Sequence, residues 1–92
     1  MNIDNRALTV TQQTDKLAIN WGSYDIAKGH SVTYHQPSSQ SIVLNRVLGN
    51  NGSQIHGKLN ANGQVFLLNP NGVLFAKGAE VNVRGLVAST KS

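Results

Sequence analysis

The segment from Gly63 to Ala79 constrains the fold more than any other part of the chain. It contains two short apolar runs that flank Asn69-Pro70-Asn71-Gly72, a stretch made almost entirely of turn residues. Proline fixes its φ angle and removes an amide donor, and Asn-Gly takes positive φ values at little cost. The sequence therefore predicts a sharp turn between two short strands at this point.

The rest of the chain repeats this plan. Short bursts of apolar residues alternate with a period of two, and turn residues separate them, as at Gly49-Asn50-Asn51-Gly52 and Asn60-Ala61-Asn62-Gly63. No window offers several helical turns with a cap at each end. The chain is therefore predicted to be all-β.

The strands expected in the C-terminal half are about four or five residues long, which is short for a β-sandwich. Such strands suit a β-solenoid, in which short strands wind into coils that stack in parallel. We expect Val65–Leu68, Val73–Phe75 and Glu80–Val83 to be three sides of one coil. Ile42–Leu48 and the segment around Ile55–Leu59 then belong to the coil before it.

Residues before Ser41 alternate more cleanly, over longer strands. An open solenoid end exposes strand edges that need protection, so we expect these strands to pair antiparallel and to cover the first coil. A small barrel or sandwich is the structural alternative.

Composition narrows the range of functions. The 92 residues make one small domain or a piece of a larger one, and only 13% of them are charged. The net charge of +4 comes from basic residues scattered singly, so the dense basic patch typical of nucleic-acid binding is missing. The chain has no cysteine, which excludes disulfides and thiol chemistry. No apolar run is long enough to span a membrane.

The sequence predicts no catalytic site, metal site or cofactor. The spacing of His30, His35 and His56 fits no zinc motif. Of the few carboxylates, only Asp25 and Glu80 are expected to be ordered, and nothing in the sequence brings them together as a polysaccharide-cleaving site requires. Asp25 is expected to hydrogen-bond the turn backbone near Tyr24 and Ala27.

The order and spacing of several motifs resemble a known family. The chain is similar to the N-terminal secretion domain of two-partner-secreted exoproteins of the filamentous-haemagglutinin and high-molecular-weight-adhesin type, also called the haemagglutination activity domain. The matching segments run nearly from end to end: Ile19–Ile26, Val32–Pro37, Val43–Gly49, Ser53–Leu59, Asn62–Val73 and Val81–Thr90.

The resemblance implies a right-handed parallel β-helix with N-terminal antiparallel capping strands. We expect residues 1–40 to form the cap and first strands and residues 41–92 the coils of a partial secretion domain. It further implies a secreted or cell-surface protein that crosses the periplasm and is recognised by an outer-membrane β-barrel transporter with periplasmic polypeptide-binding domains. The exported protein would be an adhesin, a haemolysin or a contact-dependent toxin, with a host or bacterial cell surface as a further partner.

The chain departs from the family in two respects. It lacks a signal peptide, and it ends at Ser92, where the family's domains continue through further coils. We therefore expect it to be a piece of a longer protein.

The candidate site residues are those of the asparagine motifs, namely Asn45, Arg46, Asn69, Pro70, Asn71 and Gly72. They are interpreted as coil corners, with transporter contact as the functional alternative, and Arg46 is expected to link neighbouring coils. For Trp21 and Phe66 we expect core packing or a cap contact rather than ligand binding. A carbohydrate-binding or carbohydrate-cleaving β-helix, and a nucleic-acid binder driven by the net charge, are the other hypotheses.

Overall fold

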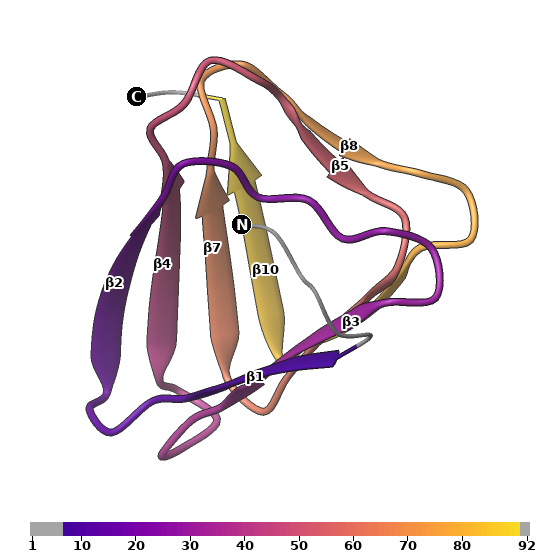
Figure 1. Cartoon of the computed structure of the whole chain (residues 1–92). Helices are drawn as coiled ribbons and strands as arrows, with labels where there is room; N and C mark the ends of the chain where they lie inside the picture. Colours follow the sequence, from indigo (N-terminus) through magenta and orange to yellow (C-terminus); the bar gives the residue numbers. More distant parts are fainter. Residues whose placement is uncertain (1–6, 91–92) are drawn as a thin grey trace.

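Residues 7–90 wind as a three-sided coil that is built only of strands and the turns and loops between them (Figure 1). The computed structural model describes residues 7–90, and within this range no helix could cross a membrane. The strands are, in chain order, β1 (Ala7–Thr11), β2 (Lys16–Trp21), β3 (Ser31–His35), β4 (Ile42–Val47), β5 (Ser53–Ile55), β6 (Lys58–Ala61), β7 (Gln64–Leu68), β8 (Val73–Phe75), β9 (Glu80–Asn82) and β10 (Gly85–Ser89).

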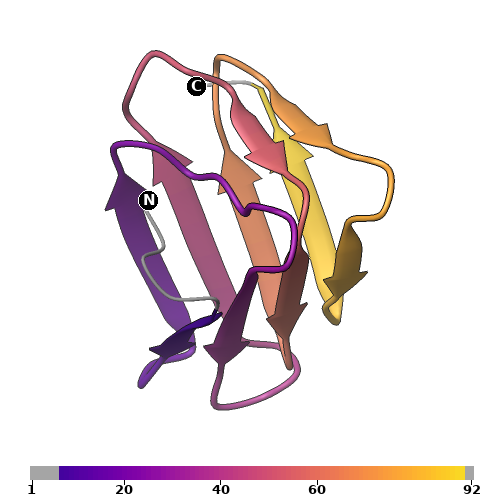
Figure 2. The same ribbon diagram turned by 45° about the vertical axis from the view of Figure 1, so that its right-hand side comes forward.

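The strands form three sheets, and all the pairings between them are parallel. Sheet A has the order β1-β3-β6-β9, sheet B has the order β10-β7-β4-β2, and sheet C pairs β5 with β8. A parallel bridge between Ile26 and Ile55 extends sheet C by one further coil. Because consecutive strands lie in different sheets, each passage through the three sheets adds one coil to the stack (Figure 2).

The predicted parallel solenoid is confirmed, and so is the assignment of strands to coils. Strands β7, β8 and β9 lie in three different sheets and form three sides of one turn. The expected segment 55–59 is divided between β5 and β6 by a corner at His56-Gly57. This corner is tight because a Cβ atom on Gly57 would lie 2.5 Å from the Ala27 carbonyl oxygen of the preceding coil.

The expected antiparallel pairing of the first strands is wrong for the described residues. Strand β1 pairs in parallel with β3, and β2 pairs in parallel with β4, so both strands belong to the stack of coils. An alternating pattern shows only that one face of a strand is buried. It carries no information on the direction of the partner strand.

The core consists of columns of apolar side chains that stack from coil to coil. In sheet B, Leu17, Val43, Val65 and Leu86 occupy the same register position on successive strands. In sheet A, the inward positions of β3 and β6 are filled by Val32 and Leu59, both fully buried. Each coil therefore repeats the apolar pattern of the one before it, and stacking makes the core continuous.

Asparagine side chains also stack between coils. The Asn82 side-chain amide donates to Asn60 Oδ1 at 3.1 Å, and the Asn60 side-chain amide donates to Thr33 Oγ1 at 3.3 Å. This ladder runs along the outer side of sheet A, on β3, β6 and β9. It satisfies polar groups on the solvent-facing side of that sheet.

Candidate recognition groove at the asparagine corners

The Asn69-Pro70-Asn71-Gly72 segment forms the corner between β7 and β8. Asn69 is fully buried, and its side-chain oxygen accepts the Asn71 amide at 2.9 Å, which closes an Asx turn. The Gly72 amide donates to the Asn69 carbonyl at 3.0 Å, and Gly72 has a φ of 106°, a value that favours glycine. The segment is therefore a coil corner, as its sequence indicates.

This corner is also tied to the corner one coil earlier. The Asn69 side-chain amide donates to the Asn51 carbonyl at 3.1 Å and to Ser53 Oγ at 3.0 Å. The Asn71 side-chain amide donates to the Gly49 carbonyl at 2.9 Å. Two asparagines of one motif thus hold two successive corners in a fixed stack.

Asn45 and Arg46 do not form a corner, in contrast to the interpretation of the sequence. Both lie within β4, and the chain leaves the strand only after Val47. Asn45 points inward and is fully buried, whereas Arg46 points outward and is exposed. The alternation of β4 therefore sends two adjacent motif residues to opposite faces of sheet B.

Asn45 lies at the centre of a buried polar network. Its side-chain oxygen accepts Trp21 Nε1 and the Tyr34 hydroxyl, each at 2.9 Å, and its amide donates to the Phe66 carbonyl at 3.2 Å. The Tyr34 and Tyr24 hydroxyls are 2.7 Å apart. It is thus Asn45, rather than Arg46, that links neighbouring coils by side-chain hydrogen bonds.

Burial controls the ionisation of this network. Desolvation raises the pKa of Tyr24 to about 12, despite the opposing effect of its hydrogen bond with Tyr34. Desolvation likewise raises the pKa of Tyr34, and the neighbouring Tyr24 raises it further. The ring of Trp21 packs edge-on against Tyr24 with centroids 5.7 Å apart, so the predicted packing role of Trp21 agrees with its position.

The stacked corners enclose an open groove of about 550 Å³. The end of β4 and the turn after it line one side, and the start of the Asn-Pro-Asn-Gly corner lines the other. The lining residues are Arg46, Val47, Leu48, Gly49, Asn50, Leu68, Pro70 and Asn71. The groove unites Arg46 with Pro70 and Asn71, whereas Asn45 and Asn69 lie buried beneath the surface and Gly72 lies outside the lining.

The groove combines apolar contacts with one cation. Leu48 is 64% exposed, and Pro70 is also exposed. Among residues 7–90 the ion pair is that of Lys58 with Glu80, and Arg46 forms none. Exposed leucine and proline beside a free guanidinium suit a peptide partner that carries apolar and acidic side chains. Sequence reasoning did not single out Leu48 or Leu68, because only the stacking of coils brings them to the groove.

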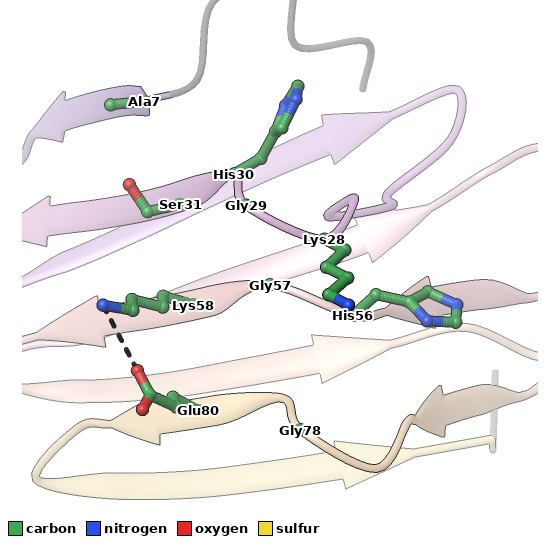
Figure 3. Close-up of a pocket in the computed structure, with 10 residues that line it drawn as sticks. All are labelled: Ala7, Lys28, Gly29, His30, Ser31, His56, Gly57, Lys58, Gly78 and Glu80. Atoms are coloured by element: carbon green, nitrogen blue, oxygen red, sulfur yellow. Dashed lines mark ion pairs between the residues drawn. The ribbon is translucent and has the colours of Figure 1, made fainter.

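A second hollow, of about 500 Å³, lies at the corners between sheets C and A (Figure 3). Its basic side chains do not converge on one point. Lys28 points toward His56, His30 points away from both, and Lys58 forms an ion pair with Glu80 at 3.4 Å. Residues 7–90 contain no group of three or more His, Asp or Glu side chains that could hold a metal ion.

The two candidate carboxylates have separate partners. Asp25 Oδ1 accepts a hydrogen bond from the Gln54 backbone amide of the next coil at 2.8 Å, in place of the local turn amides expected from the sequence. Glu80 forms an ion pair with Lys58. The polysaccharide-cleaving hypothesis needs two carboxylates that share a site, and the described residues do not assemble that pair. Phe66 also differs from expectation, since it lies half-buried on the outer side of sheet B and not in the core.

Comparison with known proteins identifies the family. The TPS secretion domain model matches residues 1–92, the whole chain. The chain belongs to the TPS secretion domain family. TPS secretion domains target exoproteins for export and are not a class of enzymes.

Relatives of this TPS domain come from Haemophilus influenzae. Two sequences named heme/hemopexin-binding protein, one from strain Rd, are 51% identical over 84 residues, which is 91% of this chain and 9% of each relative. The crystal structure of the HMW1 secretion domain from the same species matches with a TM-score of 0.90 and 37% identity, over all of this chain and 24% of that one. This TPS domain thus spans a small part of the proteins that it resembles.

Proposed function

We propose that this TPS domain binds the periplasmic polypeptide-binding domains of an outer-membrane β-barrel transporter and thereby commits its exoprotein to export. The exoprotein reaches the periplasm first and then follows the domain through the barrel to the cell surface. Membership of the TPS family supports this proposal, because a secretion domain of this type requires a transporter as its partner.

The corner groove is the observation that carries the proposal. It gathers residues of both asparagine motifs at one open surface. There it combines exposed Leu48 and Pro70 with Arg46, which forms no ion pair with any carboxylate of residues 7–90. Hydrogen bonds from Asn69 and Asn71 fix the two corners that form its walls. A rigid surface of this kind loses little conformational entropy when a partner binds.

Strand addition is a second contact open to the transporter. Before its coils have stacked, a partly folded chain presents strand edges with unpaired backbone donors and acceptors. An extended segment of the transporter can add to such an edge by β-augmentation. Folding of successive coils outside the cell would then oppose return of the chain.

The activity of the remainder of the exoprotein is proposed only at the level of the family. Adhesion, haemolysis and contact-dependent killing are the activities implied by the family resemblance, with a host or bacterial cell surface as the target. The relatives' name adds haem or hemopexin binding to this range. No residue of the secretion domain is assigned to any of these activities.

Co-precipitation with the transporter's periplasmic domains tests the proposal. The full protein that carries this chain should bind them, and Leu48→Asp should weaken binding by about tenfold or more, as expected when an exposed apolar contact is replaced by a charge. Leu74→Asp is the matched control, because Leu74 is 51% exposed on sheet C, outside the groove. Absence of binding by the unmodified protein would overturn the proposed function.

A further inference from the structure

The outer sides of the two large sheets differ in chemistry. On sheet A the outward positions are polar or small, and Thr33, Asn60 and Asn82 satisfy one another in the side-chain ladder. The polar groups of such a surface are hydrogen-bonded to one another or to water, so the surface needs no covering layer. Sheet A therefore has the character of a solvent-facing side.

The outer side of sheet B is apolar along its centre. The strand registers align one row of outward residues across the whole sheet, and further apolar residues flank it on both sides. The central row is Ala18, Leu44, Phe66 and Val87, and the flanking residues are Ile42 and Leu68. A shallow apolar hollow of about 450 Å³ lies over Ala18, Ile42, Leu44 and Phe66.

Strands β4 and β7 have the sequence of strands that are covered on both faces. Ile42-Val43-Leu44 and Val65-Phe66-Leu67-Leu68 are continuous apolar runs, and they do not alternate with polar residues. Parallel strands with such runs are normally buried on both sides. In the solenoid their inner side packs in the core, while Leu44 and Phe66 on the outer side have no covering layer among residues 7–90.

The charge on this outer side has a single sign. Lys16 stands at the start of β2 and Arg46 near the end of β4, so the two cations lie on opposite sides of the apolar row. None of the four strands of sheet B contains an aspartate or a glutamate. The outer side of sheet B therefore complements a partner that is apolar in the middle and acidic on both sides of that apolar part.

The apolar side is continuous with the corner groove. Arg46 and Leu68 line the groove and also occupy outward positions of β4 and β7, directly beside Leu44 and Phe66 along those strands. A partner seated in the groove can thus extend across sheet B without a break in contact. We propose that the outer side of sheet B is a docking surface for a segment of the transporter's periplasmic domains whose apolar side chains cover Leu44 and Phe66 and whose acidic residues pair with Arg46 and Lys16. This inference rests on the proposed function and assigns its surface.

A second copy of the chain fits this surface poorly. Two sheets B packed face to face would each contribute Lys16 and Arg46 to the interface, with no carboxylate from the sheet strands to balance them. Like charges brought together without partners oppose association. The transporter segment, with its acidic residues, avoids this repulsion.

Site-specific photo-crosslinking tests the inference in the full protein that carries this chain, expressed with its transporter. A photoreactive phenylalanine analogue at position 66 preserves an aromatic side chain, and the same analogue at position 74 marks sheet C as the control. Position 66 should crosslink to the periplasmic domains of the transporter several times more efficiently than position 74. Similar yields at both positions, or crosslinks from position 66 into the protein's own chain, would overturn the inference.

A charge reversal provides the second measurement. Arg46→Glu should lower the crosslinking yield at position 66 by about tenfold and weaken its dependence on salt, because the cation at the rim attracts the acidic partner. Lys28→Glu makes the same change in net charge at a different place, in the hollow of Figure 3, and should leave the crosslinking yield at position 66 unchanged. Equal effects of both reversals would indicate attraction by net charge alone and would also overturn the inference.

The two proposals fail in different ways. If the unmodified protein neither binds the periplasmic domains nor needs the transporter for secretion, the proposed function is wrong, and the proposed docking surface is then wrong as well. If the protein binds and Leu48→Asp weakens binding, while position 66 gives no transporter crosslink, only the docking surface on sheet B is wrong.

Discussion

At the scale of single residues, the asparagines have different roles, and residue type alone does not distinguish them. Asn69 and Asn71 are recognisable from the sequence because proline and glycine mark their turn. Asn45 carries no such mark, and its burial follows from the inward phase of β4, between Val43 and Val47. A polar residue at a core position is costly unless every polar atom finds a partner.

Replacing Asn45 tests how much this network stabilises the fold. Asn45→Ala should lower the free energy of unfolding by about 2–3 kcal/mol, because Trp21 Nε1 and the Phe66 carbonyl lose partners inside the protein. Urea unfolding followed by tryptophan fluorescence measures the change. Asn60→Ala is the control, since Asn60 is only half-buried, and its effect should stay below about 1 kcal/mol. Equal losses in both variants would contradict a special role for the buried network.

The two tyrosines predict how stability depends on alkaline pH. The fold favours the neutral phenols, because burial raises the pKa of Tyr24 to about 12 and raises that of Tyr34 as well, above the ordinary value of 10.0. Their contribution to stability is thus complete below pH 10 and is lost as the pH rises through the folded-state pKa values.

Ultraviolet absorbance of tyrosinate measures this directly, since Tyr24 and Tyr34 are the only tyrosines in the sequence. The folded protein should show little tyrosinate at pH 10–11, whereas the urea-unfolded protein should titrate near the ordinary value of about 10. Coincident titration curves would show that neither phenol is buried.

At the scale of the elements, the sequence predicts strands and corners well but not their partners. The segments expected at 65–68, 73–75 and 80–83 correspond to β7, β8 and β9 because short apolar runs between turn residues leave few alternatives. The break at His56-Gly57 was missed, since a lone glycine after a histidine is a weak turn signal. Only the packing of Gly57 against the preceding coil shows why the chain turns there.

A side chain at position 57 should destabilise the fold. In Gly57→Ala, the new Cβ would lie 2.5 Å from the Ala27 carbonyl oxygen and 2.7 Å from Ile26 Cγ2, so the corner must shift away from the preceding coil. Overpacking of this kind costs about 1–3 kcal/mol, which thermal or urea unfolding will detect. Gly22→Ala is the matched control, because nothing lies within 4 Å of its Cβ position, and its stability should change by less than about 1 kcal/mol. A Gly57→Ala variant as stable as the control would contradict the tight corner.

At the scale of the whole molecule, the sequence predicts the solenoid and only part of the candidate site. Pro70 and Asn71 were expected at a corner and lie in the groove, but Leu48 and Leu68 join them only because coils stack in register. Phe66 is expected to pack in the core or against a cap, because an apolar run does not show which of its residues face outward. Side-chain direction depends on the phase of the strand, and that phase is fixed by contacts with the neighbouring coils.

Stacking in one dimension predicts a gradient of stability along the coil axis. Strands β3, β6, β4 and β7 have a partner strand on both sides, whereas β9 and β10 close the described stack with a partner on one side only. All three residues of β9 are exposed, while β7 buries Val65 and Leu67. In a solenoid each coil is stabilised mainly by its neighbours, so the last coil should open most often.

Amide hydrogen exchange of the 92-residue chain measures this gradient strand by strand. Amides of β4 and β7 should exchange at least about a hundredfold more slowly than those of β9, because central strands exchange through larger opening reactions. Val43→Ala, a change in the buried centre of the stack, should speed exchange in β7 as well as in β4, since coils stabilise each other through their interface. Uniform protection across all strands would contradict coil-by-coil stability. A gradient would instead mean that the last described coil opens without unfolding the coils that hold the corner groove.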